Sequence, residues 1–133
     1  MTVLQLVGVV LAAIAALLHV LFFVVETVLF ARPLGRRAFG VRDEQLSPTL
    51  RLFAANQGVY NLGLALVVAA GIVLLALDPA SPVGTAVIVA GSAVMVLAGV
   101  ALALTAPRLV RAALMQALPP ALAIVALIGG LPA

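Results

Sequence analysis

Four long apolar segments run through the chain, and most of the charged residues lie between these segments or close to their ends. A helix needs about 20 apolar residues to cross the hydrocarbon core of a bilayer. The segments meet this length at about residues 3–30, 49–77, 83–105 and 108–131. Short connections between helices favour antiparallel neighbours. The pattern therefore predicts an all-α polytopic membrane protein, a four-transmembrane-helix up-down bundle that forms a single domain over residues 1–133.

Proline and capping residues mark the ends of these segments. Arg32-Pro33 ends the first, because a proline disfavours helical geometry in the residue before it. Ser47-Pro48 opens the second with a capping side chain and a proline at the first helical position. The stretch 78–82 (Asp-Pro-Ala-Ser-Pro) predicts a tight turn that ends the second helix and caps the third. Pro119-Pro120 lies inside the fourth segment, where it should free carbonyl groups one turn earlier.

Composition supports this reading. The chain is 66% hydrophobic and 8% charged, with a mean hydropathy of +1.38, which lies far outside the composition of soluble domains. The first apolar run is also longer than the 7–15-residue core of a signal peptide, so we expect a retained helix. All seven basic residues are arginines, within residues 32–51 and 108–111. Arginine-rich short loops stay in the cytoplasm, which predicts that both termini lie outside.

The same composition excludes several classes of function. We read the arginines as markers of topology, and nucleic acid is not a predicted partner. There is no cysteine, and His19 is the only histidine. Disulfides, thiol catalysis and a multi-histidine metal site within one protomer are therefore excluded, and the sequence predicts no cofactor and no metal.

Polar residues inside the spans share one depth. Glu26 is six residues from Arg32 and Gln116 is five from Arg111, which places both roughly 7–15 Å inside the arginine-bearing boundary. The polar residues of the second span fall in the same layer, and His19 lies deeper, at roughly 20 Å. Polar groups in hydrocarbon usually face the bundle interior or a wet cavity. The candidate ligand-binding residues are His19, Glu26, Asn56, Gln57, Tyr60, Asn61 and Gln116.

Their spacing suggests how these side chains meet. Seven residues separate His19 from Glu26, so in an α-helix they point to nearly the same face, about 10 Å apart along the axis. In the second span, Asn56/Tyr60 and Gln57/Asn61 each lie one turn apart and form two polar ridges beside Gly58. As a protonated acid, Glu26 could donate a hydrogen bond to Asn56 or Gln57. The same groups can equally hold helices together, with no ligand.

Several of these residues carry a resemblance. His19, Glu26, the loop Gly35 to Gly40, the string Ala-Asn-Gln-Gly-Val-Tyr-Asn at 55–61 and Gln-Ala-Leu-Pro at 116–119 resemble a family of small bacterial integral membrane proteins catalogued as domain of unknown function 1304. A tryptophan often follows the first-span glutamate in that family, whereas this chain has Phe30. The resemblance implies four spans and a location in the bacterial inner membrane, and it implies no activity.

The sequence thus predicts an integral inner-membrane protein that binds or transports a small polar or amphiphilic molecule at a cytoplasm-facing polar site. Its expected partners are the lipid bilayer, this ligand and a second copy of the chain in a homo-oligomer, because one small protomer has little room for a cavity. Two alternatives stay open: a structural or accessory subunit, and a membrane-embedded enzyme acting on a lipid-like substrate with Glu26 as acid or base. We identify no catalytic residue, since no nucleophile, metal set or phosphate loop is recognisable.

Overall fold

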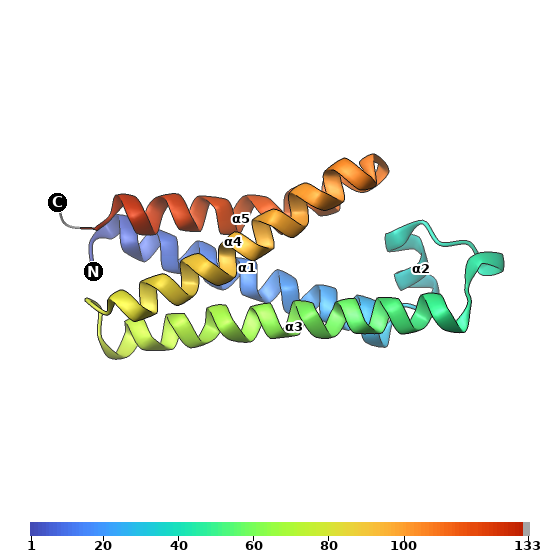
Figure 1. Cartoon of the computed structure of the whole chain (residues 1–133), viewed down its shortest axis with the longest axis horizontal. Helices are drawn as coiled ribbons and strands as arrows, with labels where there is room; N and C mark the ends of the chain where they lie inside the picture. The colour runs from blue at the N-terminus through green and yellow to red at the C-terminus, as the bar shows by residue number, and fades with distance from the viewer. Residues whose placement is uncertain (132–133) are drawn as a thin grey trace.

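The computed structural model describes residues 1–131 and is dominated by four long helices (Figure 1). They are α1 (Val3–Phe23), α3 (Pro48–Leu77), α4 (Pro82–Thr105) and α5 (Val110–Gly129). Shorter elements join them: the π-helical turn η1 (Val24–Val28), helix α2 (Pro33–Phe39) and the 3-10 turns η2 (Asp43–Gln45) and η3 (Pro107–Leu109).

Local signals in the sequence explain where the long helices begin. Thr2 caps α1 by accepting a hydrogen bond from the backbone N–H of Gln5 at 3.2 Å. Ser47 caps α3 and Ser81 caps α4 in the same way, each followed by a proline at the first helical position. The side chain of Asp78 accepts from the backbone of Ala80 at 3.0 Å and tightens the α3–α4 turn. These caps satisfy backbone N–H groups that have no partner within the helix.

The four long helices form an up-down-up-down bundle. Each packs against its neighbours in a ring of α1, α3, α4 and α5, and α5 closes the ring against α1. Figure 1 shows both termini and the α3–α4 turn at one end, with α2 and the α4–α5 connection at the other. All seven arginines belong to this second end, which we call the arginine end. The predicted all-α four-helix bundle is therefore confirmed.

The helices are long and apolar enough to cross a membrane over Val3–Val28, Pro48–Leu77, Pro82–Thr105 and Pro107–Gly129. Large apolar side chains remain exposed on the outside of every span, as at Leu17, Leu66, Leu97 and Val125. Lipid tails are as apolar as these side chains, so such a surface is stable in a bilayer. The chain is thus built as a multi-pass membrane protein.

Close packing is concentrated toward the terminal end of the bundle. A Cβ atom on Gly71 would lie 2.7 Å from Ile88 Cγ1 and 3.0 Å from the carbonyl oxygen of Gly84. Gly8 is equally close to Leu127. Small residues let helix backbones approach each other in lipid. The buried core runs through this region and is formed by Ala12, Ala15, Ala16, Ala65, Val68, Leu75, Ile88, Met95, Ala123 and Leu127.

Toward the arginine end the bundle separates into two pairs of helices. Gly58 of α3 packs directly on Thr27 of η1, and Gly99 of α4 packs on Ala113 and Ala117 of α5. Each pair therefore stays in close contact. Figure 1 shows the α4–α5 pair diverging from α1 and α3 at this end. The space between the pairs positions the candidate site.

The first span differs from the prediction near its end. The sequence predicts a helix to about residue 30, but α-helical geometry ends at Phe23, and a π turn follows to Val28. The loop beyond it holds α2, whose Gly35 lies against the backbone of Leu29 with no room for a Cβ atom. Gly40 ends α2 in the left-handed region, at φ 63°. Neither α2 nor the π turn was predicted from the sequence.

Candidate functional site

Glu26 lies in the middle of the π turn and reaches across to α3. Its Oε2 atom accepts a hydrogen bond from Asn61 Nδ2 at 2.6 Å. Next to it, the Thr27 hydroxyl donates to the backbone carbonyl of Ala55 at 3.3 Å. Two polar contacts therefore join η1 to α3, one on each side of Gly58. π turns inside helices occur frequently at functional sites.

The partner of Glu26 differs from the expectation of Asn56 or Gln57. The absence of a side chain at Gly58 sets the closest approach, since a Cβ atom there would lie 3.2 Å from Glu26 Cβ. With 3.6 residues per turn, Asn61 lies about 60° from Gly58 around α3, whereas Gln57 lies about 100° and Asn56 about 160° away. Asn61 is therefore the amide on the face that meets η1.

A cavity of about 440 Å³ lies between the two helix pairs, and we call it the central cavity. Four of the predicted polar residues line it: Glu26 from η1, Gln57 and Asn61 from α3, and Gln116 from α5. The remaining lining is mostly apolar and comes from Phe39, Ala98, Ala101, Leu102, Thr105 and Leu109. Amides and a carboxyl group from three spans thus border one space, and a single chain is sufficient to form it.

Gln116 lies in α5, one turn before a pair of prolines. Its side chain is buried, with 8% exposed. Pro119 and Pro120 lie inside the continuous helix α5 and have no backbone N–H. They therefore cannot bond to the carbonyl groups of Met115 and Gln116, one turn earlier. These two carbonyl oxygens therefore lack their usual donors within the helix.

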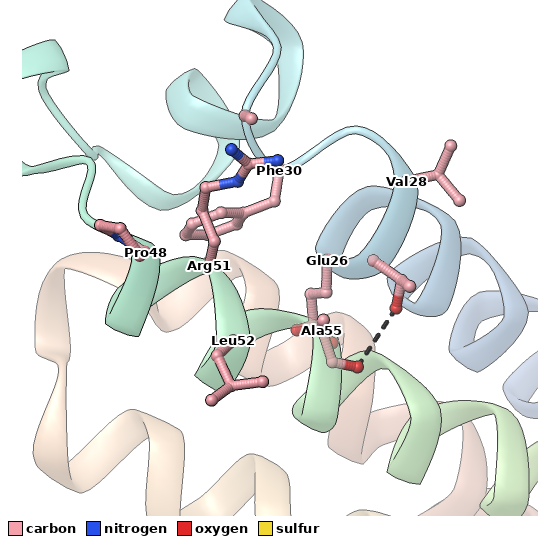
Figure 2. Close-up of a pocket in the computed structure, with 9 residues that line it drawn as sticks. Glu26, Val28, Phe30, Pro48, Arg51, Leu52 and Ala55 are labelled. Atoms are coloured by element: carbon pink, nitrogen blue, oxygen red, sulfur yellow. Dashed lines mark hydrogen bonds between the residues drawn. The ribbon is translucent and has the colours of Figure 1, made fainter.

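Two further cavities adjoin Glu26. The first, of about 380 Å³, lies between the end of η1 and the start of α3, and we call it the lateral cavity. Figure 2 shows Glu26 and Arg51 among its lining residues, with the guanidinium group directed toward Phe30 and away from the carboxyl group of Glu26. The second, of about 390 Å³, lies beneath α2 and includes Asn56, Gln57 and Phe39. Glu26 is the one residue common to all three cavities.

Two of the predicted site residues do not line any of these cavities. His19 is fully buried in α1, where its Nδ1 atom donates to the carbonyl of Ala15 at 2.9 Å and its ring packs edge-on against Phe22. The Nε2 atom has no partner within residues 1–131. Tyr60 faces outward from α3, with 64% of its surface exposed. Neither residue lines any of the three cavities around Glu26.

A change from α to π geometry lies between His19 and Glu26. The expectation of a shared face assumed continuous α-helical winding from residue 19 to residue 26. A π turn closes its hydrogen bonds over five residues instead of four. Leu29 N–H bonds to the Val24 carbonyl in this way, at 3.0 Å. Glu26, in the middle of this turn, accepts a hydrogen bond from Asn61 of α3, whereas His19 bonds within α1.

Charges around the site are sparse. In the part of the chain that the structure describes, the ion pair is formed by Arg36 and Asp43, outside the spans. Glu26 and Arg51 thus have no ionic partner among these residues. No group of three His, Cys, Asp or Glu side chains comes together within them either. The central cavity therefore offers hydrogen-bond donors and acceptors together with one carboxyl group, which suits a polar ligand bearing hydroxyl or amine groups.

Three contributors to the site were missed by the sequence analysis. Thr27 was not singled out, although it is a small polar residue beside Glu26 in an apolar span. Arg51 was read as a boundary marker, and yet it lines the lateral cavity with Glu26. Phe39 of α2 lines two of the cavities. Only Thr27 could have been identified from the sequence. The positions of Arg51 and Phe39 at the cavities depend on how the loop 32–47 folds back.

A family model covers the part of the chain that holds the site residues. No curated protein and no solved structure matches the chain. The family model described as "Protein of unknown function (DUF1304)" matches residues 13–128, which include η1, the polar stretch of α3 and Gln116. The resemblance found in the sequence is confirmed: the chain belongs to the DUF1304 family.

Proposed function

We propose that the protein binds a small polar or amphiphilic molecule in the central cavity, for passage across the membrane or for sensing. The convergence of Glu26, Gln57, Asn61 and Gln116 on one space supports this function. Polar groups at this depth are costly unless they are paired or meet water or a ligand. Within residues 1–131, only Asn61 and Glu26 of these four make a side-chain hydrogen bond. The amides of Gln57 and Gln116 remain available to a ligand.

The size and lining of the cavity fit the same function. Ligand pockets commonly measure about 300–1,000 Å³ and combine apolar walls with a few polar groups. The central cavity has a volume of about 440 Å³ and this mixed lining. No arginine lines it, so the carboxyl group of Glu26 is its one ionisable group. We therefore favour a ligand with hydroxyl or amine groups over an anionic one.

The positions of the arginines support one orientation of the protein in the membrane. By the distribution of arginine in short loops, the arginine end faces the cytoplasm and both termini face outward. In a bacterial inner membrane the central cavity would then receive its ligand from the cytoplasmic side. A homo-oligomer stays a prediction, and the cavity does not require one.

Thiol labelling tests access to this cavity, because the chain contains no cysteine. Gln57→Cys and Gln116→Cys place a thiol in the cavity lining, and Leu97→Cys places one on the exposed apolar surface of α4. The probe is the membrane-impermeant reagent 2-(trimethylammonium)ethyl methanethiosulfonate, added to inverted and to right-side-out vesicles. We expect both cavity positions to react from the cytoplasmic side at least about tenfold faster than Leu97→Cys, because thiolates form only where water reaches.

Two outcomes would contradict the proposal. Equal reaction rates at Gln116→Cys and Leu97→Cys would show that water does not enter the cavity. Labelling only in right-side-out vesicles would reverse the orientation. Glu26→Gln in the Gln116→Cys background sharpens the test, because removal of the acidic group should slow this cationic reagent at the cavity under conditions where Glu26 is ionised, and should leave Leu97→Cys unaffected.

One observation favours a structural role instead. The contacts of Glu26 with Asn61 and of Thr27 with Ala55 hold η1 against α3, as interhelical hydrogen bonds do in many membrane proteins. If holding helices is the only role, Asn61→Leu should lower stability while the reaction rate at Gln116→Cys equals that of Leu97→Cys. The two measurements therefore separate the structural role from the binding role.

A further inference from the structure

The lateral cavity lies at the depth where lipid head groups meet hydrocarbon. Helix α3 has 30 residues, about 45 Å at 1.5 Å per residue, whereas a bilayer core is about 30 Å thick. Its segment from Leu62 to Leu77 contains no polar side chain, so the excess length belongs to the start of the helix. Arg51 lies in the first turn and therefore sits at head-group level. Gly58, which contacts Glu26, lies about 10 Å deeper along the axis.

The cavity is lined by one basic and one acidic side chain that do not pair with each other. Arg51 and Glu26 both line it, and within the described residues neither forms an ion pair. In Figure 2 the guanidinium group points toward Phe30, away from the carboxyl group. Arg51 is exposed and Glu26 is partly buried, so the first can pair with a phosphate group, and an ammonium group beside the second would favour its ionised form. An occupant with an anionic group toward Arg51 and a cationic group toward Glu26 would give each of these side chains a partner of opposite charge.

The outer rim of the lateral cavity is apolar and open to the bilayer. Val28 and Leu52 line it with 57% and 69% of their surfaces exposed. On the inner side, the hydrogen bond from Thr27 to Ala55 joins η1 to α3. A molecule with a polar head and an apolar body can therefore place its head in the cavity while its body remains along the lipid-facing surface.

We propose that the lateral cavity binds the head group of a membrane lipid that carries both a phosphate and a primary ammonium. Arginine pairs with phosphate oxygens through two parallel N–H donors. Asn61 occupies one oxygen of Glu26, which leaves the other to accept from an ammonium N–H. A quaternary ammonium has no N–H to donate. This inference rests on the proposed function, because Glu26 lines both the lateral and the central cavity. It names the class of ligand that reaches Glu26 from the bilayer.

Native mass spectrometry of the purified full-length protein tests this inference by resolving individual bound lipids. The probes are phosphatidylethanolamine, phosphatidylcholine and phosphatidylglycerol with identical acyl chains at equal concentration. We expect phosphatidylethanolamine to bind more tightly than the other two by on the order of tenfold, the ratio that one charge-assisted hydrogen bond supplies. Equal retention of the three lipids would overturn the proposal.

Three variants test which side chain contacts which part of the lipid head group. Glu26→Gln keeps an oxygen that can accept from Asn61, and should reduce the binding of phosphatidylethanolamine to the level of phosphatidylcholine. Arg51→Gln should weaken the binding of all three phosphate-bearing lipids. Arg108→Gln is the matched control, because Arg108 is exposed at the same end and lines none of the cavities around Glu26, so its lipid binding should be that of the wild type. An unchanged lipid preference in Glu26→Gln would also overturn the proposal.

A competition measurement distinguishes a lipid from a soluble molecule with the same head-group chemistry. We expect O-phosphoethanolamine, in tenfold excess, not to displace bound phosphatidylethanolamine, and displacement would contradict binding from the bilayer. The thiol-labelling experiment is independent of this one. If Gln116→Cys is labelled and the three lipids bind equally, only the lipid inference is wrong. If phosphatidylethanolamine is preferred and Gln116→Cys is not labelled, the proposed ligand route through the central cavity is wrong.

Discussion

The two ends of this bundle are built differently. Toward the terminal end, small residues such as Gly71 and Gly84 bring four backbones together around a buried apolar core. Toward the arginine end, the bundle separates into an α1–α3 pair and an α4–α5 pair, and polar side chains border the space between them. Both ends use glycine for close approach. At the terminal end glycines join the two pairs, and at the arginine end they join helices only within a pair.

The comparison indicates that one half of the bundle provides the packing and the other half holds the cavity. In lipid, helix association depends on packing and on interhelical hydrogen bonds, because the hydrophobic effect does not drive it. The terminal half can supply most of the packing that holds the four helices in place. The arginine half is then free to keep a cavity and amides, such as those of Gln57 and Gln116, that have no side-chain hydrogen bond within residues 1–131. The predictions below test this division through the free energy of unfolding in detergent micelles or bicelles.

The largest effect is expected in the packed half. Ile88 is fully buried and contacts Gly71, so Ile88→Ala should leave a cavity and lower the free energy of unfolding by about 3 kcal/mol. Leu97→Ala in the same helix is the control, because Leu97 is 69% exposed and should change the free energy by less than about 0.5 kcal/mol. Similar losses at the two positions would contradict a packed terminal half.

The next effect concerns the contact within the α1–α3 pair. A Cβ atom on Gly58 would collide with the Thr27 hydroxyl and lie 3.2 Å from the Phe23 carbonyl oxygen. Gly58→Ala should therefore separate η1 from α3 and cost about 2 kcal/mol by overpacking. Gly63 lies in the same helix and has nothing within 4 Å of its Cβ position. Gly63→Ala should be neutral or stabilise the protein by up to about 1 kcal/mol, because alanine has the higher helix propensity.

A smaller effect is expected from the polar contact of the open half. Asn61→Leu removes the hydrogen bond to Glu26 and should lower the free energy of unfolding by about 1 kcal/mol, as interhelical hydrogen bonds in membranes typically contribute. Gln57→Leu, in the same helix and cavity, is the matched control, and we expect a change below about 0.5 kcal/mol because no hydrogen bond of its side chain is found among the described residues. An equal loss in both variants would show that the amides act only through packing.

The smallest effect is expected on the outer surface of α3. Tyr60 is 64% exposed and lines none of the cavities around Glu26. Tyr60→Phe should therefore change the free energy of unfolding by less than about 0.5 kcal/mol and leave the thiol-labelling rate at Gln116→Cys unchanged. A loss above about 1 kcal/mol would place Tyr60 in a contact with another protomer, which a concentration-dependent stability would reveal.

Much of the site could be predicted from the positions of polar residues along the spans. Glu26, Gln57, Asn61 and Gln116 share a depth because each is a similar number of residues from an arginine, and a helix converts residue number into depth at a fixed rise. Their direction was less predictable. Asn61, rather than Asn56 or Gln57, meets Glu26 because Gly58 selects the face of α3 that contacts η1.

The sequence by itself determined the four spans, the caps at Ser47 and Ser81 and the shared depth of the polar residues, because hydropathy, capping and helical rise act over neighbouring residues. Only the tertiary structure decided that the first span ends in a π turn, that His19 and Tyr60 lie apart from the site, and that Arg51 joins Glu26 at one cavity. These features depend on the contact between η1 and α3, and the local sequence does not specify the rotation of one helix against another.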